Sequence, residues 1–208
     1  MKRISMLLLA TGLMVGAAPA ALALEDCSCK QIHATGQGWC DKCNSGMAFG
    51  VPITSKKLYT ALAGTKVDAA KVKCPGCKTA PKDGGTCEHC HAGFHAAQAY
   101  HSLVAYTLSQ GMHVDPKNVK CPGCKAALTG KDSAGHAAHF CKECDAGFVG
   151  PLAFKGRENY DQAENAMTIL KAAAKEASHC EDCAVAMVTD GTCEHCKTHF
   201  KNGKKITG

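Results

Sequence analysis

Hydrophobic side chains recur at helical spacing in three segments of the chain. In residues 96–110, Tyr100, Val104 and Leu108 are four positions apart and would share one face of a helix. Gly111 follows this segment, and glycine is a common helix stop. The pattern therefore predicts an amphipathic helix that ends at Gly111.

The segment 55–63 repeats this pattern in a shorter form. Ser55 could cap the helix, Leu58 and Leu62 would face inward, and Gly64 would end it. Residues 55–63 are therefore predicted to form a second helix.

The longest apolar stripe lies at 158–177. Tyr160, Ala163, Met167 and Leu170 follow one another at spacings of three and four residues. Such a stripe could bind a partner helix. Packing against the adjacent part of the same chain is the interpretation that the pattern favours.

Extended stretches follow the first two helical segments. Residues 67–73 and 114–120 are each predicted to run as a short strand into the next cysteine pair, and Pro116 limits the second to an edge or irregular strand. The third helical segment lacks such a stretch and runs almost directly into Cys180. The Lys- and Gly-rich tail, 201–208, is expected to fray.

The first 23 residues have the pattern of a secretory signal peptide. The basic pair Lys2-Arg3 precedes an apolar stretch at 6–15, and a small-x-small pattern predicts cleavage after Ala23. An uncleaved N-terminal anchor is the alternative. No other stretch is long and apolar enough to span a bilayer, so the mature protein is expected to be periplasmic or secreted.

The chain contains an internal repeat. A shift of 47 residues places Cys27 on Cys74 and Tyr59 on Tyr106 without a gap, and the third unit carries seven extra residues. The fourth unit begins at Cys180. Self-similarity at this period predicts modules built from one supersecondary unit.

All sixteen cysteines fall into eight close pairs, and the pairs form four sets. Two such pairs separated by about ten to sixteen residues are the sequence form of a tetrahedral four-cysteine metal site. The predicted metal ligands are Cys27, Cys29, Cys40, Cys43, Cys74, Cys77, Cys87, Cys90, Cys121, Cys124, Cys141, Cys144, Cys180, Cys183, Cys193 and Cys196.

A glycine and an apolar residue follow the second cysteine pair of most units. The glycine suits a positive φ at the end of a tight turn, and it is replaced by His199 in the last unit. The apolar residues are expected to cover the sulfurs and limit solvent access. They are Met47, Phe94, Phe148 and Phe200.

Composition explains why metal would be needed. Large apolar residues are sparse, with one Trp and six Phe, and each cysteine module is too short to fold on a hydrophobic core of its own. The predicted segments are a signal peptide at 1–23, modules at 24–53, 74–95, 121–156 and 180–208 (the last with the tail), and helical linkers at 54–73, 96–120 and 157–179.

The formal net charge of +6 does not by itself indicate an anionic partner. Removal of the signal peptide lowers it, and four metal–tetrathiolate centres would each add two negative charges. Lysines directly follow four of the cysteine pairs. The favoured interpretation is that these lysines offset the negative charge of the nearby metal–tetrathiolate centres. The four lysines are Lys30, Lys78, Lys125 and Lys197.

The pairs resemble the knuckles of zinc ribbons and rubredoxin-like proteins. The resemblance is best at the two CPGCK strings, 74–78 and 121–125, and extends more loosely to all eight pairs. It implies a structural metal site and a small β-hairpin fold, and no particular activity. Together with the helical segments and the repeat, the predicted fold is a small metal-stabilised α+β one, with four tandem zinc-ribbon-like modules joined by helices. Cys27 and Cys29 depart from the pattern because a single residue separates them.

Other interpretations of the cysteines are open. Export would allow disulfides, but a disulfide within CxxC closes a very small loop and stabilises little. Redox-active dithiols need a βαβ context that the sequence lacks. The string at 87–91 has the form of a c-type haem site, CxxCH, although Cys87 and Cys90 are needed for the second quartet. His136 and His139 could supplement the third site, whereas His89 and His195 are expected to donate hydrogen bonds near sulfur.

No pattern for enzymatic catalysis stands out. We therefore expect an exported, non-enzymatic interaction or scaffold protein that binds about four Zn²⁺ per chain, with an unidentified protein partner and an open oligomeric state. Metal buffering or transfer (zinc or copper) and electron transfer through rubredoxin-like iron are the alternatives. Nucleic-acid binding is disfavoured by the signal peptide and by the low aromatic content.

Overall fold

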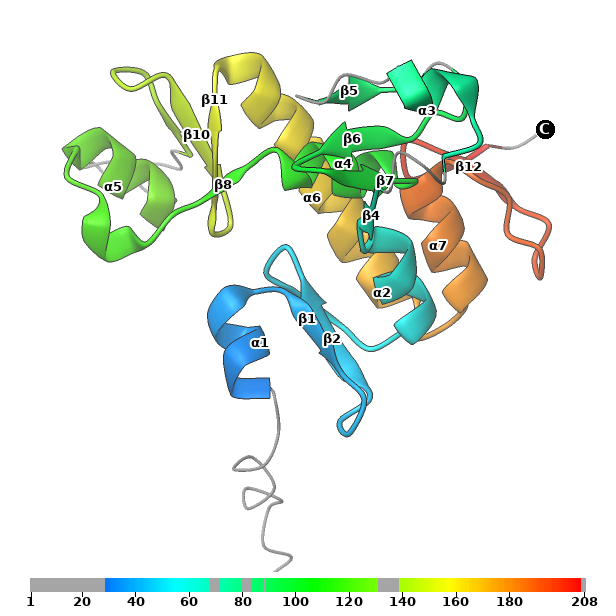
Figure 1. Ribbon diagram of the computed structural model, residues 1–208. Helices are drawn as coiled ribbons and strands as arrows, with labels where there is room; N and C mark the ends of the chain where they lie inside the picture. The colour runs from blue at the N-terminus through cyan, green and yellow to red at the C-terminus, as the bar shows by residue number, and fades with distance from the viewer. Residues whose placement is uncertain (1–28, 68–71, 80–83, 88, 131–138, 207–208) are drawn as a thin grey trace, which may run out of the picture.

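The computed structural model describes residues 29–67, 72–79, 84–87, 89–130 and 139–206 (Figure 1). The predicted signal peptide, Cys27 and His136 lie outside these ranges. Within them, no helix is both long and apolar enough to cross a membrane. The described chain is a small mixed α+β protein.

The same order of elements recurs in each unit: a helix at the first cysteine pair, a β-hairpin beside the second pair, and a second helix in the first three units. Unit 1 has α1 (Cys29–Thr35), β1 (Gly38–Cys40), β2 (Ser45–Ala48), β3 (Val51–Ile53), α2 (Lys56–Leu62) and β4 (Thr65–Lys66). Unit 2 has α3 (Pro75–Thr79), β5 (Gly85–Thr86), β6 (Gly93–His95), β7 (Gln98–Tyr100), α4 (Leu103–Ser109), β8 (Met112–His113) and a 3₁₀ turn (Pro116–Asn118).

The second half of the chain varies this order. Unit 3 has α5 (Pro122–Thr129), β9 (Phe140–Cys141), β10 (Ala146–Val149), β11 (Leu152–Lys155) and α6 (Arg157–Glu176). Unit 4 has α7 (Glu181–Thr189), β12 (His199–Lys201) and β13 (Lys204–Ile206). As the sequence predicts, α6 is followed by α7 without an intervening strand.

The strand at the end of one unit completes the sheet of the next. The strand orders are β1-β2-β3, β4-β7-β6-β5, β8-β11-β10-β9 and β12-β13, and every pairing is antiparallel. Thus β4 of unit 1 lies at the edge of the unit 2 sheet, and β8 of unit 2 lies at the edge of the unit 3 sheet. Both strands end before the predicted extended stretches, 67–73 and 114–120, begin, so these predictions are wrong in position. Pro116–Asn118 form a 3₁₀ turn, and the described residues of 67–73 contain no strand.

The prediction of a helix over 96–110 is wrong in its first half. Residues 98–100 form β7, and the helix starts only at Leu103, after the N-cap Ser102. Ala96 and Ala97 have φ of 50° and 61°, which makes a tight hairpin turn rather than a helical one. The helix propensity of the alanines in this segment is overridden because β6 and β7 pair as a hairpin.

The tail is also more ordered than the sequence predicts. Asn202 and Gly203 have φ of 49° and 71°, which suits the two-residue turn between β12 and β13. An Asn-Gly pair is a strong hairpin signal, and the Lys-rich composition of 201–208 masks it. Residues 207–208 lie outside the described part of the chain.

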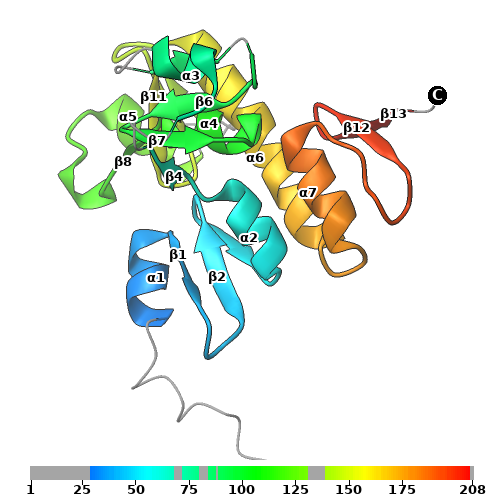
Figure 2. The ribbon, with the colours of Figure 1, turned by 45° about the vertical axis from the view of Figure 1, so that its right-hand side comes forward.

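Four helices, α2, α4, α6 and α7, pack against one another and form a shared core. In Figures 1 and 2, α2, α4, α6 and α7 gather at the centre while the hairpins extend outward, and α6 contacts both α4 and α7. Their buried side chains belong to one hydrophobic cluster that spans all four units. Many of them are alanines, among them Ala105, Ala163, Ala173 and Ala184, which are fully buried.

Two buried serines begin the helices of this core. Ser55 accepts a hydrogen bond from the Leu58 N–H, and Ser102 accepts one from the Ala105 N–H. Ser102 also donates to the Val188 carbonyl oxygen at 2.7 Å, which joins α4 to α7. The predicted cap at Ser55 is therefore confirmed, and its repeat at Ser102 links units 2 and 4.

The shared core predicts that one internal leucine stabilises the whole array. Leu170 on α6 is 0% exposed, and truncation to Ala removes buried contacts and leaves a cavity. We expect Leu170→Ala to lower the free energy of unfolding by about 2–5 kcal/mol in chemical denaturation. Leu103→Ala is the control, because Leu103 is 43% exposed and its truncation should change stability by less than about 0.5 kcal/mol. Equal effects of the two substitutions would contradict a shared core.

Candidate metal centres

The structure brings the predicted cysteines together in four clusters. Three contain four cysteines, and the sulfurs of each lie within 4.8 Å of one another. The fourth contains the three described cysteines of unit 1, since Cys27 lies outside the described residues. The clusters are Cys74, Cys77, Cys87 and Cys90; Cys121, Cys124, Cys141 and Cys144; Cys180, Cys183, Cys193 and Cys196; and Cys29, Cys40 and Cys43.

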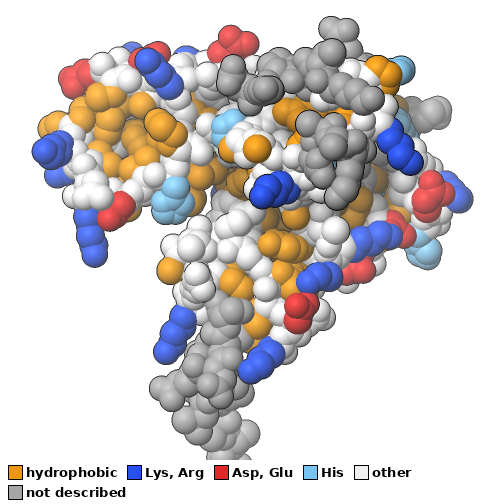
Figure 3. Space-filling model, in the orientation of Figure 1, with side chains coloured by type: hydrophobic (Ala, Val, Ile, Leu, Met, Phe, Trp, Pro, Cys, Tyr) orange, Lys and Arg blue, Asp and Glu red, His pale blue; other side chains and the backbone are white. Residues whose placement is uncertain are grey.

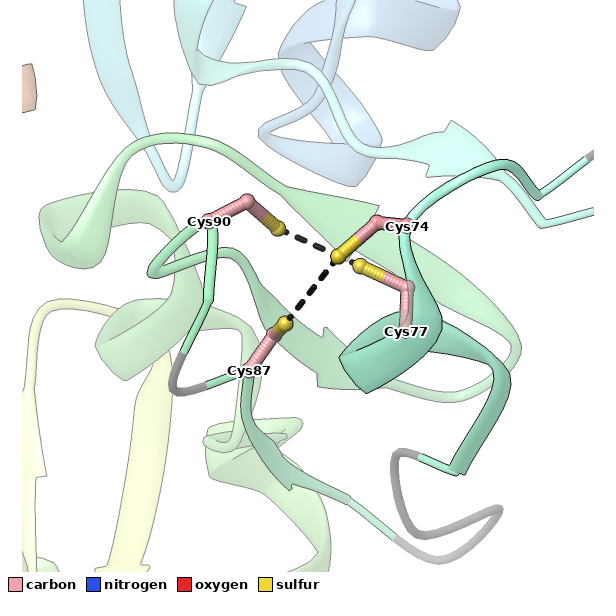
Figure 4. A group of neighbouring side chains, drawn as sticks. All are labelled: Cys74, Cys77, Cys87 and Cys90. Atoms are coloured by element: carbon pink, nitrogen blue, oxygen red, sulfur yellow. Dashed lines mark hydrogen bonds between the residues drawn. The ribbon is translucent and has the colours of Figure 1, made fainter.

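The sulfur–sulfur distances fit a tetrahedral cation and do not fit disulfides. A cation with four sulfurs about 2.3 Å away would hold them about 3.8 Å apart, whereas a disulfide needs about 2.05 Å. The Sγ atoms of Cys74 and Cys87 are 3.7 Å apart, and those of Cys77 and Cys90 are 3.2 Å apart (Figure 4). The twelve cysteines of the three complete clusters form no disulfide. The clusters could therefore hold metal ions.

The distances repeat in the other units. The Sγ atoms of Cys121 and Cys141 are 3.8 Å apart, and those of Cys180 and Cys193 are 3.7 Å apart. In unit 1, Cys29 and Cys43 approach to 3.4 Å. One geometry thus recurs across units of different length.

The first cysteine pair of each complete cluster lies at the start of a helix. Cys121 is the N-cap residue of α5, with Pro122 at the next position, and Cys180 is the N-cap residue of α7. The Cys183 N–H donates to the Cys180 Sγ over 3.4 Å. Free N–H groups at a helix start favour negative charge, so this placement suits a thiolate.

The second pair lies at the turn that precedes the hairpin. In unit 4 the Cys196 N–H donates to the Cys193 Sγ over 3.3 Å. The same kind of backbone donor, from Cys90, lowers the pKa of Cys87 to about 6, and that from Cys196 lowers the pKa of Cys193 to about 7. Because these pKa values lie below the ordinary value of 9.0, ionisation of the two thiols stabilises the folded chain, fully so above pH 9.0. This contribution to stability is lost as the pH falls through about 7 for Cys193 and about 6 for Cys87.

The remaining sulfurs oppose full ionisation. Burial raises the pKa of Cys124 and of Cys183, and a hydrogen bond with Cys90 raises that of Cys77. Four thiolates so close together repel one another, so a cluster can become fully ionised only with a cation among the sulfurs.

The glycine after the second pair has a different role from the predicted one. The positive φ falls on the residue directly after the last cysteine, at Asn44, His91, Asp145 and Lys197. The glycine instead leaves room for an aromatic ring. A Cβ on Gly93 would lie 2.1 Å from the Tyr106 ring, and one on Gly147 would lie 2.2 Å from the Tyr160 ring.

The predicted hydrophobic cover is confirmed. Phe94, Phe148 and Phe200 are 9%, 6% and 2% exposed, and each packs with the cysteines of its own cluster. Met47 packs against the cysteines of unit 1. On the face shown in Figure 3, the hydrophobic side chains around the third cluster reach the surface over α5 and β10.

Each cluster has one exposed cysteine at the same position. It is the last cysteine of the unit: Cys43, Cys90, Cys144 or Cys196. The other described cysteines are buried or half-buried. Each cluster is thus covered on one side and reachable from solvent on the other.

The histidines do not join the clusters among the described residues. His139, predicted as a possible supplement to the third site, instead lies against Gly130. The His195 Nδ1 lies 3.5 Å from the Cys196 Sγ, which agrees with the predicted place of this side chain near sulfur. Cys87 and Cys90 both belong to the second quartet. This agrees with the prediction that they complete a four-cysteine cluster, which is the argument against a CxxCH haem site.

Comparison of the chain with protein-family models, with curated proteins and with solved structures finds no match. The functional argument therefore depends on the geometry of this chain alone.

The clusters predict a defined change in metal content. Cys193 is fully buried and central to the fourth cluster, so Cys193→Ser should remove about one metal ion per chain and leave the other sites loaded. Native mass spectrometry and elemental analysis measure this. Glu194→Gln is the control, because Glu194 is exposed in the same turn and bonds only Lys197 among the described residues. Unchanged metal content in Cys193→Ser would contradict the assignment.

Proposed function

We propose that this chain is an exported zinc-binding repeat protein, with zinc-ribbon-like modules, that acts as a non-enzymatic interaction or scaffold protein. The observation that carries the proposal is the geometry of the three complete quartets, in which four sulfurs lie within 4.8 Å of one another. Four thiolates in a tetrahedron are the ligand set that Zn²⁺ takes in structural sites.

A structural role is supported by what each quartet connects. Its sulfurs come from a short helix and from a hairpin whose strands are two to four residues long. An isolated hairpin of this length is marginal in water, so a cation that joins it to the helix would supply folding free energy. All four positions around such a cation would be taken by sulfur, which leaves none for a substrate or water.

Metal buffering or transfer is the second candidate. It is supported by the exposed last cysteine of each cluster, through which an acceptor could approach the metal. The two functions differ in how metal loss is linked to folding. A structural ion leaves when its module unfolds, whereas a transferable ion leaves while the module stays folded.

Chelation separates these functions. With excess chelator under reducing conditions, we expect metal to leave at the rate at which the circular-dichroism signal is lost, and added Zn²⁺ to restore that signal. Stopped-flow release to a chromogenic chelator gives the first rate. Fast release with an unchanged spectrum would instead establish metal handling and refute the structural role.

Export has its own test. Expression of the full chain in a bacterial host should yield a periplasmic protein whose mass is that of a chain starting at Leu24, since the small-x-small pattern ends at Ala23. Ala23→Glu should block the cut and leave the 208-residue mass, while Glu25→Ala, just after the site, should be processed normally. Full-length protein in the cytoplasm would refute export.

A further inference from the structure

The units of this chain add strands to one another. In unit 2, β4 pairs with the outer strand β7, with Thr65 opposite Ala99 and Lys66 opposite Gln98. Unit 3 repeats this arrangement, with β8 on β11. The outer edge of the hairpin is therefore a strand-accepting surface in both middle units.

The added strand continues past these pairs in the same way in both units. The Val67 N–H donates to the Ala97 carbonyl oxygen, and the Val114 N–H donates to the Pro151 carbonyl oxygen. Val67 also packs beside the cysteines of its cluster, as Val114 does in the next unit. An added strand thus extends the sheet and covers part of the metal centre.

The backbone direction at this edge follows from the pairing. In an antiparallel ladder, alternate residues present their N–H and C=O to the same neighbour. Because Ala97 bonds the added strand, Ala99 also faces it, and Ala153 does so in unit 3. The repeat places Pro52 at this position in unit 1 and Lys205 in unit 4.

The two terminal units differ at this position. Pro52 has no N–H, so the edge of unit 1 cannot form the full ladder, and proline is a common guard of edge strands. Lys205 in β13 has its N–H, and among the described strands only β12 pairs with β13. No strand lies between α6 and α7 that could fill this edge as β4 and β8 do in units 2 and 3, because α6 leads directly into α7.

The open edge lies at the periphery of the molecule. In Figure 2 the β12–β13 hairpin lies beside α7 and apart from the other sheets, with Gly203 of its turn against Ile169 of α6. All three residues of β13 are exposed. The edge is therefore accessible to another chain.

Charge distinguishes this edge from the filled ones. The residues opposite the added strand are Gln98 and Ala99 in unit 2, and Lys204 and Lys205 in unit 4. Lys201 lies on the neighbouring strand, and residues 199–206 contain no Asp or Glu. The edge would repel a second copy of itself and attract an acidic strand.

We propose that the outer edge of β13 binds an extended, acidic segment of a partner protein by antiparallel strand addition. The inference rests on the proposed function, since it names one surface through which the scaffold would bind. The segment takes the place that β4 and β8 take in units 2 and 3. It carries acidic side chains opposite Lys204 and Lys205, and an apolar side chain where Val67 and Val114 lie.

A designed peptide tests this directly. The probe contains Glu-Glu-Val, the acidic counterpart of Thr65-Lys66-Val67, within a short uncharged sequence, and it carries a fluorescent label. The control peptide contains Lys-Lys-Val. We expect the metal-loaded full chain to bind the acidic peptide at least tenfold more tightly, by fluorescence anisotropy.

Two variants separate strand addition from simple charge attraction. Lys205→Pro copies the closed edge of unit 1, and Lys204→Glu/Lys205→Glu reverses the charge; each should weaken binding of the acidic peptide at least tenfold. Lys171→Glu/Lys175→Glu is the matched control, because both lysines are exposed on α6. It should leave affinity within about twofold.

The outcomes are distinct. Binding that survives Lys205→Pro, or that the α6 control weakens equally, would overturn strand addition in favour of diffuse electrostatics. Equal affinity for the two peptides, or no binding, would also overturn it. Metal content and circular dichroism, measured on the same samples, report on the proposed function separately. A fully loaded, folded chain that ignores the peptide refutes the edge proposal alone, and a folded chain without metal refutes the structural metal role alone.

Discussion

Four sulfurs held within a few ångströms are the constraint that the three complete units of this protein share. In each complete cluster they come from two short elements, a helix start and a hairpin turn, that have little apolar surface of their own. Backbone N–H groups and a covering phenylalanine favour charge at some of these sulfurs and limit water at others. A cation among them is the simplest way to balance four thiolates in so small a volume.

A second interaction joins the units. Helices α2, α4, α6 and α7 bring a shared core together at the centre of the molecule, and small side chains let their backbones approach closely. Ser102 adds a buried hydrogen bond from α4 to α7. The sulfur clusters thus shape each unit locally, while the helices and the added strands fix the units relative to one another.

The sequence predicts the local features well, because they depend on residues close together in the chain. The cysteine quartets, the cap at Ser55, the covering phenylalanines and the direct run of α6 into α7 were all predictable. The shared core was not, since alanine-rich stripes such as that of α6 look too weak to build one until their partner helices are known. The hairpin turn at Ala96 and the packing of Gly93 on Tyr106 likewise depend on contacts between distant residues.

X-ray absorption spectroscopy at the metal edge of the purified protein is the most direct test of this account, because it reports the ligands and their distances without assuming the fold. The account predicts zinc with an average first shell of four sulfurs at about 2.3 Å. A shell dominated by nitrogen or oxygen, or protein without metal whose sulfurs are oxidised to disulfides, would contradict it.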